Sequence, residues 1–85
     1  MLTHTRVKKP TSGTEFGNMN GFINTEATAG TLTWTLWNPD EGDSTVRTFE
    51  YAAGKCPVNV FVPLAVKKVV AGTAADLNDV TVYGV

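Results

Sequence analysis

Two alternating stretches separated by a turn constrain the fold of this chain more than any other feature. The first, TLTWTLWN at residues 31–38, places Leu32, Trp34 and Leu36 on one side of an extended backbone and threonines on the other. This alternation has the period of a half-buried β-strand. The next residues, NPDEGD, are typical of a turn, and STVRTFEYAA at residues 44–53 provides a second strand. The sequence therefore predicts a β-hairpin in the middle of the chain.

Three further strands are predicted in the second half of the chain. The segment VNVFV at residues 58–62 is a strand that we expect Pro63 to end, because proline cannot donate to a sheet ladder. The segment LAVKKVVAG at residues 64–72 fits either the strand or the helix period, and its valines favour a strand. The segment VTVYGV at residues 80–85 is apolar on both faces, so we expect it either inside the sheet or paired at an edge with another subunit.

Five strands and no convincing helix predict an all-β domain, either a small β-sandwich or a barrel. The residues that we expect in its core are Leu32, Trp34, Leu36, Phe49, Tyr51, Val58, Val60, Val62, Val66, Val70, Val80 and Val82.

Residues 1–30 are rich in Thr, Asn and Gly and show no sustained period of either kind. We expect an extended, irregular N-terminal arm with loops, including one short strand around residues 3–9, and a β domain at residues 31–85. Residues 1–14 carry basic side chains and no acid, which suits an acidic partner, although a solvated and partly disordered arm is the alternative. The arm residues that we expect to contact a partner are Arg6, Lys8, Lys9, Phe16, Phe22 and Ile23.

The size and composition of the chain favour assembly with other subunits. A core of 85 residues supplies only about 3–5 kcal/mol of net stability, and oligomerisation is a usual source of more. Cys56 is the one cysteine, so no intramolecular disulfide can form, and a reducing compartment is expected. No apolar run approaches the roughly 20 residues that span a bilayer, and no signal peptide begins the chain. We therefore expect synthesis in the cytoplasm and no membrane partner.

The sequence contains no pair of residues suited to catalysis. Nucleophilic catalysis needs a nucleophile held against a base, and nothing in the spacing brings His4 and Cys56 together. Gly54 and Lys55 lack the remaining residues of a phosphate-binding loop. The protein is therefore not expected to be an enzyme or to hold a cofactor.

Acidic residues gather in two of the predicted turns. Asp40, Glu41 and Asp43 lie in one turn, and Asp76 and Asp79 lie in another. A calcium site is chemically possible if the two loops meet, but neither loop has a known calcium-binding spacing. Solvated turn residues are the simpler interpretation, since Asp favours turns through local hydrogen bonds.

Nucleic acid is an unfavoured partner for this chain. The net charge of −1 argues against a protein that covers nucleic acid. Trp37, Phe61 and Tyr83 could stack bases beside Lys67 or Lys68, but neighbouring residues of a strand point to opposite faces, so only one lysine could join them. Trp37 has two equally supported interpretations: it is a lid over the hairpin, or it is an anchor in a contact between protein molecules.

The second half of the chain, residues 49–85, contains a series of short motifs. They are a strand and an Ala-Gly turn at residues 53–54, a Pro-Val strand from residue 57, a basic valine-rich strand at residues 66–70, a Gly-Thr-Ala loop at residues 72–74 and a final short strand at residues 80–85. In this series of motifs the chain resembles small structural proteins of tailed-phage virions.

The resemblance implies a capsid decoration or cement protein on the outside of the virion. Such a protein clamps neighbouring subunits of the major capsid protein without chemistry, often as a trimer at threefold or quasi-threefold positions. In this interpretation the six arm residues contact the capsid, and Trp37 and Tyr83 lie between copies. A tail, neck or fibre-attachment adaptor of the virion is the alternative, and a small barrel that binds single-stranded nucleic acid or another ligand is a third.

Overall fold

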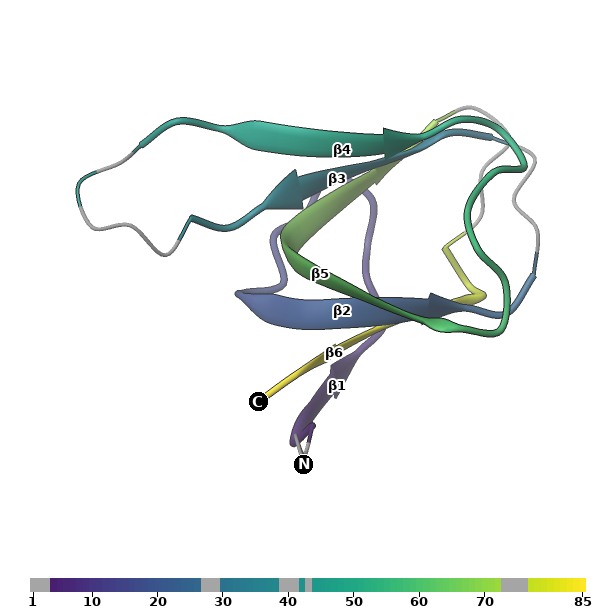
Figure 1. Ribbon diagram of the computed structural model, residues 1–85, viewed down its shortest axis with the longest axis horizontal. Helices are drawn as coiled ribbons and strands as arrows, with labels where there is room; N and C mark the ends of the chain where they lie inside the picture. Colours follow the sequence, from purple (N-terminus) through teal and green to yellow (C-terminus); the bar gives the residue numbers. More distant parts are fainter. Residues whose placement is uncertain (1–3, 27–29, 39–41, 43, 73–76) are drawn as a thin grey trace.

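The chain folds into six antiparallel β-strands that form one sheet, and the all-β prediction is confirmed (Figure 1). This computed structural model describes residues 4–26, 30–38, 42, 44–72 and 77–85, and these residues include no helix. The order of strands across the sheet is β1-β6-β2-β5-β3-β4. The strands are β1 (Arg6–Lys8), β2 (Met19–Asn24), β3 (Leu32–Leu36), β4 (Arg47–Tyr51), β5 (Phe61–Ala71) and β6 (Val80–Gly84).

The long strand β5 bends the sheet so that its two halves face each other (Figure 1). The first part of β5 pairs with β2 and the last part pairs with β3. Opposite β3 the register passes from Lys68 directly to Val66, which leaves Lys67 without a counterpart. The pairing with β2 also shifts, between Met19 and Gly21. An extra residue of this kind bends a strand and increases its twist, so these irregularities explain the shape of the sheet.

Pro63 lies inside β5, so the prediction that it ends a strand is wrong. The carbonyl oxygen of Ala65 points away from β2 and accepts a hydrogen bond from the Trp37 N–H at 3.1 Å. In a strand, the backbone N–H and C=O groups of every second residue point to the same side. The position of the missing Pro63 N–H is therefore on the side of Ala65 C=O, away from β2. The register with β3 has already ended at Val66, and no ladder bond is lost.

The core lies between the two halves of the bent sheet. Phe22 from one half stacks on Trp34 from the other, with ring centroids 4.1 Å apart, and both side chains are fully buried. The buried apolar residues are Phe16, Met19, Phe22, Leu32, Trp34, Cys56, Val66, Val69, Val80 and Val82. Five of the expected core residues are in this set, and Leu36, Tyr51 and Val62 pack against it.

Four residues that we expected in the core are exposed instead, namely Phe49, Val58, Val60 and Val70. Val70 lies opposite Thr33, on the face that points away from the core. Val58 and Val60 precede β5 and belong to a loop. Phe49 lies opposite Trp34 and so shares the inner face, but β4 is an edge strand and the other half of the sheet does not cover it.

The expectation of an irregular arm is wrong for residues 19–24, which form β2. This strand pairs with both β5 and β6 and so lies inside the sheet. The shift at Met19 and Gly21 hides the alternation that would have revealed a strand. The short strand expected near residues 3–9 is present as β1.

Residues 9–18 form the irregular loop that leads from β1 to β2. This loop follows β5, because Gly13 N–H donates to the Val69 carbonyl oxygen and Phe16 N–H donates to that of Lys67, both at 2.9 Å. The segment that was expected to reach a neighbouring molecule is thus attached to its own sheet.

The last strand, β6, lies between β1 and β2. Residues 80–85 were expected either inside the sheet or at an edge paired with another subunit, and the structure shows the strand inside the sheet. Its apolar character on both faces follows from this position, since Val80 and Val82 face the core while Tyr83 faces outward among other apolar side chains.

Candidate functional site

Phe16 and Phe22 cannot be the partner contacts that the sequence suggested. Phe22 is 0% exposed in its stack with Trp34, and Phe16 is 7% exposed at the end of the loop along β5. Both side chains fill the core, because the residues around them belong to the sheet rather than to a free arm. The prediction of their role is wrong.

The basic residues of the first segment lie along the edge of the sheet at β1. The Arg6 guanidinium donates to the carbonyl oxygens of Asn18 at 3.2 Å and Phe16 at 3.4 Å, and Lys9 Nζ donates to that of Asn78 at 2.8 Å. Arg6, Lys8 and Lys9 all remain exposed. Arg6 and Lys9 thus join neighbouring loops to β1, and all three residues present positive charge to solvent.

Ile23 and Tyr83, for which the sequence suggested different roles, lie on one face of the sheet. We define the aromatic patch as His4, Val7, Ile23, Phe61, Pro63 and Tyr83, on the outer face of β1, β6, β2 and β5. The register places Val7 opposite Tyr83 and Ile23 opposite Phe61.

Three rings form the centre of the aromatic patch. The His4 ring centroid lies 5.0 Å from that of Phe61 and 6.0 Å from that of Tyr83, and the last two lie 6.1 Å apart at 73°. These separations and the near-perpendicular geometry are typical of favourable aromatic pairs.

Gly21 makes room for this arrangement. It lies opposite both Tyr83 and Pro63, in the middle of the patch. A Cβ atom added there would overlap the Phe61 ring and the Val62 carbonyl oxygen, so the ring lies directly over the glycine backbone. Gly21, which interrupts the strand pattern in the sequence, thus allows the Phe61 ring to lie against the backbone of β2.

The aromatic patch is exposed enough to contact another molecule. Val7 is 59% exposed and Phe61 is 38% exposed, and Pro63 is exposed beside them. Isolated apolar side chains are common on protein surfaces, whereas a contiguous apolar group over four strands is a candidate for an interaction site.

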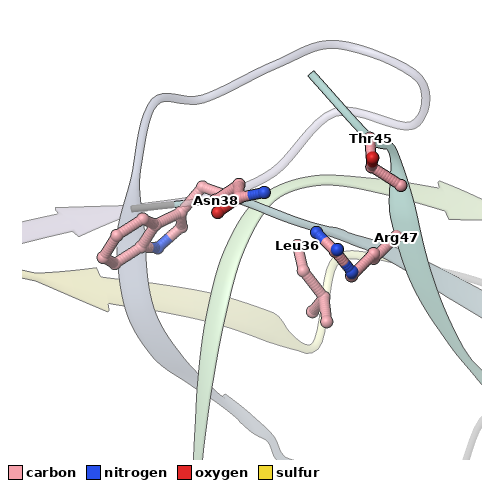
Figure 2. Close-up of a pocket in the computed structure, with 5 residues that line it drawn as sticks. Leu36, Asn38, Thr45 and Arg47 are labelled. Atoms are coloured by element: carbon pink, nitrogen blue, oxygen red, sulfur yellow. The ribbon is translucent and has the colours of Figure 1, made fainter. Parts of the chain in front are cut away.

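A concave region, separate from the aromatic patch, lies between the end of β3 and the start of β4, and Figure 2 shows it. It continues into an adjoining, larger concavity with a volume of about 240 Å³, and we call the two together the hollow. The residues that line the hollow are Asn18, Leu36, Trp37, Asn38, Ser44, Thr45, Val46, Arg47 and Lys67. None of these lining residues is a carboxylate, a histidine or a cysteine, and Lys67 Nζ lies 3.4 Å from Glu15 Oε1. The lining residues that the structure describes therefore provide no acid–base pair of the kind that catalysis requires.

Trp37 is half-buried at this hollow. Its indole N–H donates to the Met19 carbonyl oxygen at 2.7 Å, which joins the end of β3 to the start of β2. This bond favours the interpretation of Trp37 as a lid on its own molecule. The role of Trp37 between copies stays a prediction.

Cys56 is buried beside Asn24 and Tyr51, on the core side of the sheet. Burial raises the pKa of the Cys56 thiol, and the nearby Asn24 amide offsets this increase only in part. His4, in contrast, packs on Phe61 and Tyr83 at the outer face. The structure thus keeps the two potential catalytic residues on different sides of the sheet.

Two other proposed sites gain no support from the described residues. Asp40, Glu41, Asp43 and Asp76 lie outside the described part of the chain, and the described part contains no group of three or more potential metal ligands. The aromatic and basic residues for base stacking are divided, since Phe61 and Tyr83 belong to the aromatic patch while Trp37 and Lys67 line the hollow.

Comparison with known proteins identifies no relative: no family model, no curated protein and no solved structure matches this chain. The described residues also contain no helix that could cross a membrane. Functional inference therefore depends on the surface itself and on the resemblance of residues 49–85.

Proposed function

We propose that this chain is a structural protein of a tailed-phage virion, a capsid decoration protein that binds the outer shell and bridges capsid subunits without chemistry. The observation that carries the proposal is the aromatic patch, an exposed apolar surface built on four adjacent strands. The resemblance of residues 49–85 to small virion proteins supports the major capsid protein as the partner.

The aromatic patch suits contact with a rigid partner. Its side chains project from paired strands, so little backbone order has to be gained on binding. Aromatic side chains supply much of the binding energy at protein interfaces, where they fill pockets of the partner. Phe61 and Tyr83 are the best candidates for such anchors.

The basic edge at β1 lies beside this surface rather than on it. Val7 faces outward opposite Tyr83, so Arg6 and Lys8, its neighbours in β1, point to the other face of the strand. Arg6, Lys8 and Lys9 are all exposed, and their charge suits acidic residues of a capsid that extends around this edge of the sheet. Of the six contacts suggested by the sequence, the proposal keeps Arg6, Lys8, Lys9 and Ile23.

Co-sedimentation with capsids that lack the protein tests this proposal. We expect the wild-type protein to bind, and we expect the double variant Phe61→Ser with Tyr83→Ser to bind at least about tenfold more weakly, because it loses both anchors. Val70→Ser is the matched control, since Val70 is 41% exposed on the outer face of the other half of the sheet. Deletion of residues 1–24 is unsuitable, because it removes β1 and β2.

Cryo-electron microscopy of the reconstituted shell separates the virion roles. Density on the shell with the aromatic patch against capsid subunits agrees with the proposal. Density confined to the tail or portal vertex would assign the protein to the adaptor class instead. Equal binding by the double variant and the Val70→Ser control would refute the role of the aromatic patch.

A further inference from the structure

One edge of the sheet is open. In the described part of the chain, β4 pairs with β3 alone, and Figure 1 shows it along the border of the sheet. Its first four residues are exposed and the fifth is half-buried. An edge strand presents a row of N–H and C=O groups that can pair with a strand of another molecule.

The two edges of the sheet differ in how they are protected. The edge strand β1 has three residues, carries Arg6 and Lys8, and is followed by Lys9 and Pro10. Short length, basic side chains and proline all discourage pairing with another strand. The edge strand β4 has five residues, no lysine, no proline and a regular register with β3, although it carries Arg47 and Glu50. It is therefore longer than β1, and its two charges have opposite signs, so an antiparallel partner can be placed without like charges opposite each other.

We propose that β4 pairs antiparallel with β4 of a second copy of this chain, across a two-fold axis at Phe49 that is perpendicular to the sheet. This pairing would join two six-stranded sheets into one. The inference goes beyond the proposed function and does not depend on it, since it concerns the purified protein alone.

The sequence of β4 selects this register. A two-fold axis of this kind keeps the inner faces of both copies on the same side, and it passes midway between two copies of one residue, which lie directly opposite each other. An axis at Arg47 or at Glu50 would place like charges directly opposite each other, which is unfavourable. An axis at Thr48 would place Glu50 against the exposed Val46, which offers it no hydrogen bond.

An axis at Phe49 gives favourable pairs along the whole strand. Phe49 meets Phe49 of the second copy, and aromatic pairs across strands are stabilising. Thr48 lies opposite Glu50 of the second copy, where its hydroxyl can donate to the carboxylate. Arg47 lies opposite Tyr51 of the second copy, a cation next to an aromatic ring. Each of the last two pairs occurs twice.

The packing of the monomer also favours this pairing. Phe49 is 45% exposed although it lies on the inner face of the sheet, and its ring contacts Tyr51 at a centroid distance of 4.9 Å. Tyr51 in turn contacts Phe22 of the core at 6.1 Å. A row of aromatic rings thus leads from the core to the open edge, and a second copy would extend this row and cover its exposed end.

Analytical ultracentrifugation tests the proposal up to about 1 mM, because an interface of two short strands is expected to be weak. We expect the wild-type protein to form dimers. Phe49→Lys puts two positive charges at the axis and should weaken association at least about tenfold. The matched control, Thr48→Lys, puts the same charge opposite Glu50 of the second copy and should maintain or strengthen association. Circular dichroism verifies that both variants keep the β-sheet.

Disulfide formation provides a second test that needs no charge change. In a Cys56→Ala background, Phe49→Cys places two thiols directly opposite each other, with Cα atoms about 4.5–5.5 Å apart, within the range that a disulfide bridges. Thr48→Cys leaves them at a diagonal, about 7–8 Å apart, beyond ordinary disulfide geometry. We expect at least tenfold faster oxidation to a dimer for Phe49→Cys. A monomeric or trimeric wild-type protein, or association that is lost with Thr48→Lys and kept with Phe49→Lys, would overturn the proposal.

Discussion

Phe22 and Phe61 are the same residue type on adjacent strands, and they have opposite roles because they point to opposite faces. Phe22 projects inward, is fully buried and stacks on Trp34. Phe61 projects outward over Gly21 and forms the centre of the aromatic patch. The two therefore provide a matched pair for separating stability from binding.

Phe22→Ala should lower the free energy of unfolding by about 3–5 kcal/mol, because it removes a buried ring and leaves a cavity. Phe61→Ala should cost only about 1 kcal/mol, since its ring is already partly in water. A loss of this size equals the whole net stability expected for an 85-residue domain, so Phe22→Ala should be largely unfolded without urea. Urea unfolding followed by tryptophan fluorescence shows this and measures the loss for Phe61→Ala. A small effect of Phe22→Ala would mean that residues 19–24 are not part of the sheet.

Cys56 and Tyr51 predict how stability depends on alkaline pH. Burial raises the pKa of Cys56 above its ordinary value of 9.0. Burial, and then the neighbouring Cys56, raise the pKa of Tyr51 above 10.0. Both groups hold their protons more tightly in the folded chain than in the unfolded chain, so the folded state is favoured below these ordinary values and loses that advantage as pH rises.

We therefore expect the free energy of unfolding to be constant from neutral pH to about pH 8 and to decrease from about pH 9 upward. In Cys56→Ala the decrease should begin about one pH unit higher, where only Tyr51 titrates. Urea unfolding at a series of pH values measures this. A stability that increases above pH 9 would contradict the buried position of the thiol.

At the scale of elements, the sequence predicted strands wherever the alternation is regular. The hairpin of β3 and β4 and the terminal strand β6 were predicted because each alternates without interruption. The strand β2 was missed because Gly21 and the register shift beside it break the alternation. The sequence divided β5 into two strands at Pro63. A proline ends a strand only where a neighbouring strand would need its N–H, and one sequence does not show which side of β5 is paired at that residue.

Hydrogen exchange distinguishes the interior strand β2 from an arm. Both sides of β2 are paired, whereas β1 is paired on one side and is fully exposed. Amides of residues 19–24 should therefore exchange at least about 100-fold more slowly than those of the edge strand β1, which opens without disrupting the core. Nuclear magnetic resonance measures these rates residue by residue. Rapid exchange throughout residues 19–24 would restore the arm interpretation.

At the scale of the whole molecule, the two proposed contact surfaces lie at different parts of the strand order. The aromatic patch covers β1, β6, β2 and the first part of β5, while the open edge is β4 at the opposite end of the sheet. The sequence predicted contacts at Ile23 and at Tyr83 but could not place the two residues together, because their proximity depends on the register of β2 with β6. Phe61 was considered only for nucleic-acid stacking for the same reason.

The two surfaces acting together predict a loss of avidity when the dimer is broken. A dimer through β4 carries two aromatic patches, and once one patch is bound the second binds at a high effective concentration if two capsid sites are within reach. Phe49→Lys leaves the aromatic patch unchanged and should still reduce apparent capsid affinity by about 10²-fold or more.

Titration of capsids with each variant, monitored by co-sedimentation, tests this coupling. The Phe61→Ser and Tyr83→Ser double variant should lose capsid binding and still dimerise, because its β4 is intact. Phe49→Lys should bind as a monomer with weak affinity, and Thr48→Lys should behave as the wild type does. If Phe49→Lys bound capsids as tightly as the wild-type protein, each patch would act alone, and the dimer would have no part in attachment to the shell.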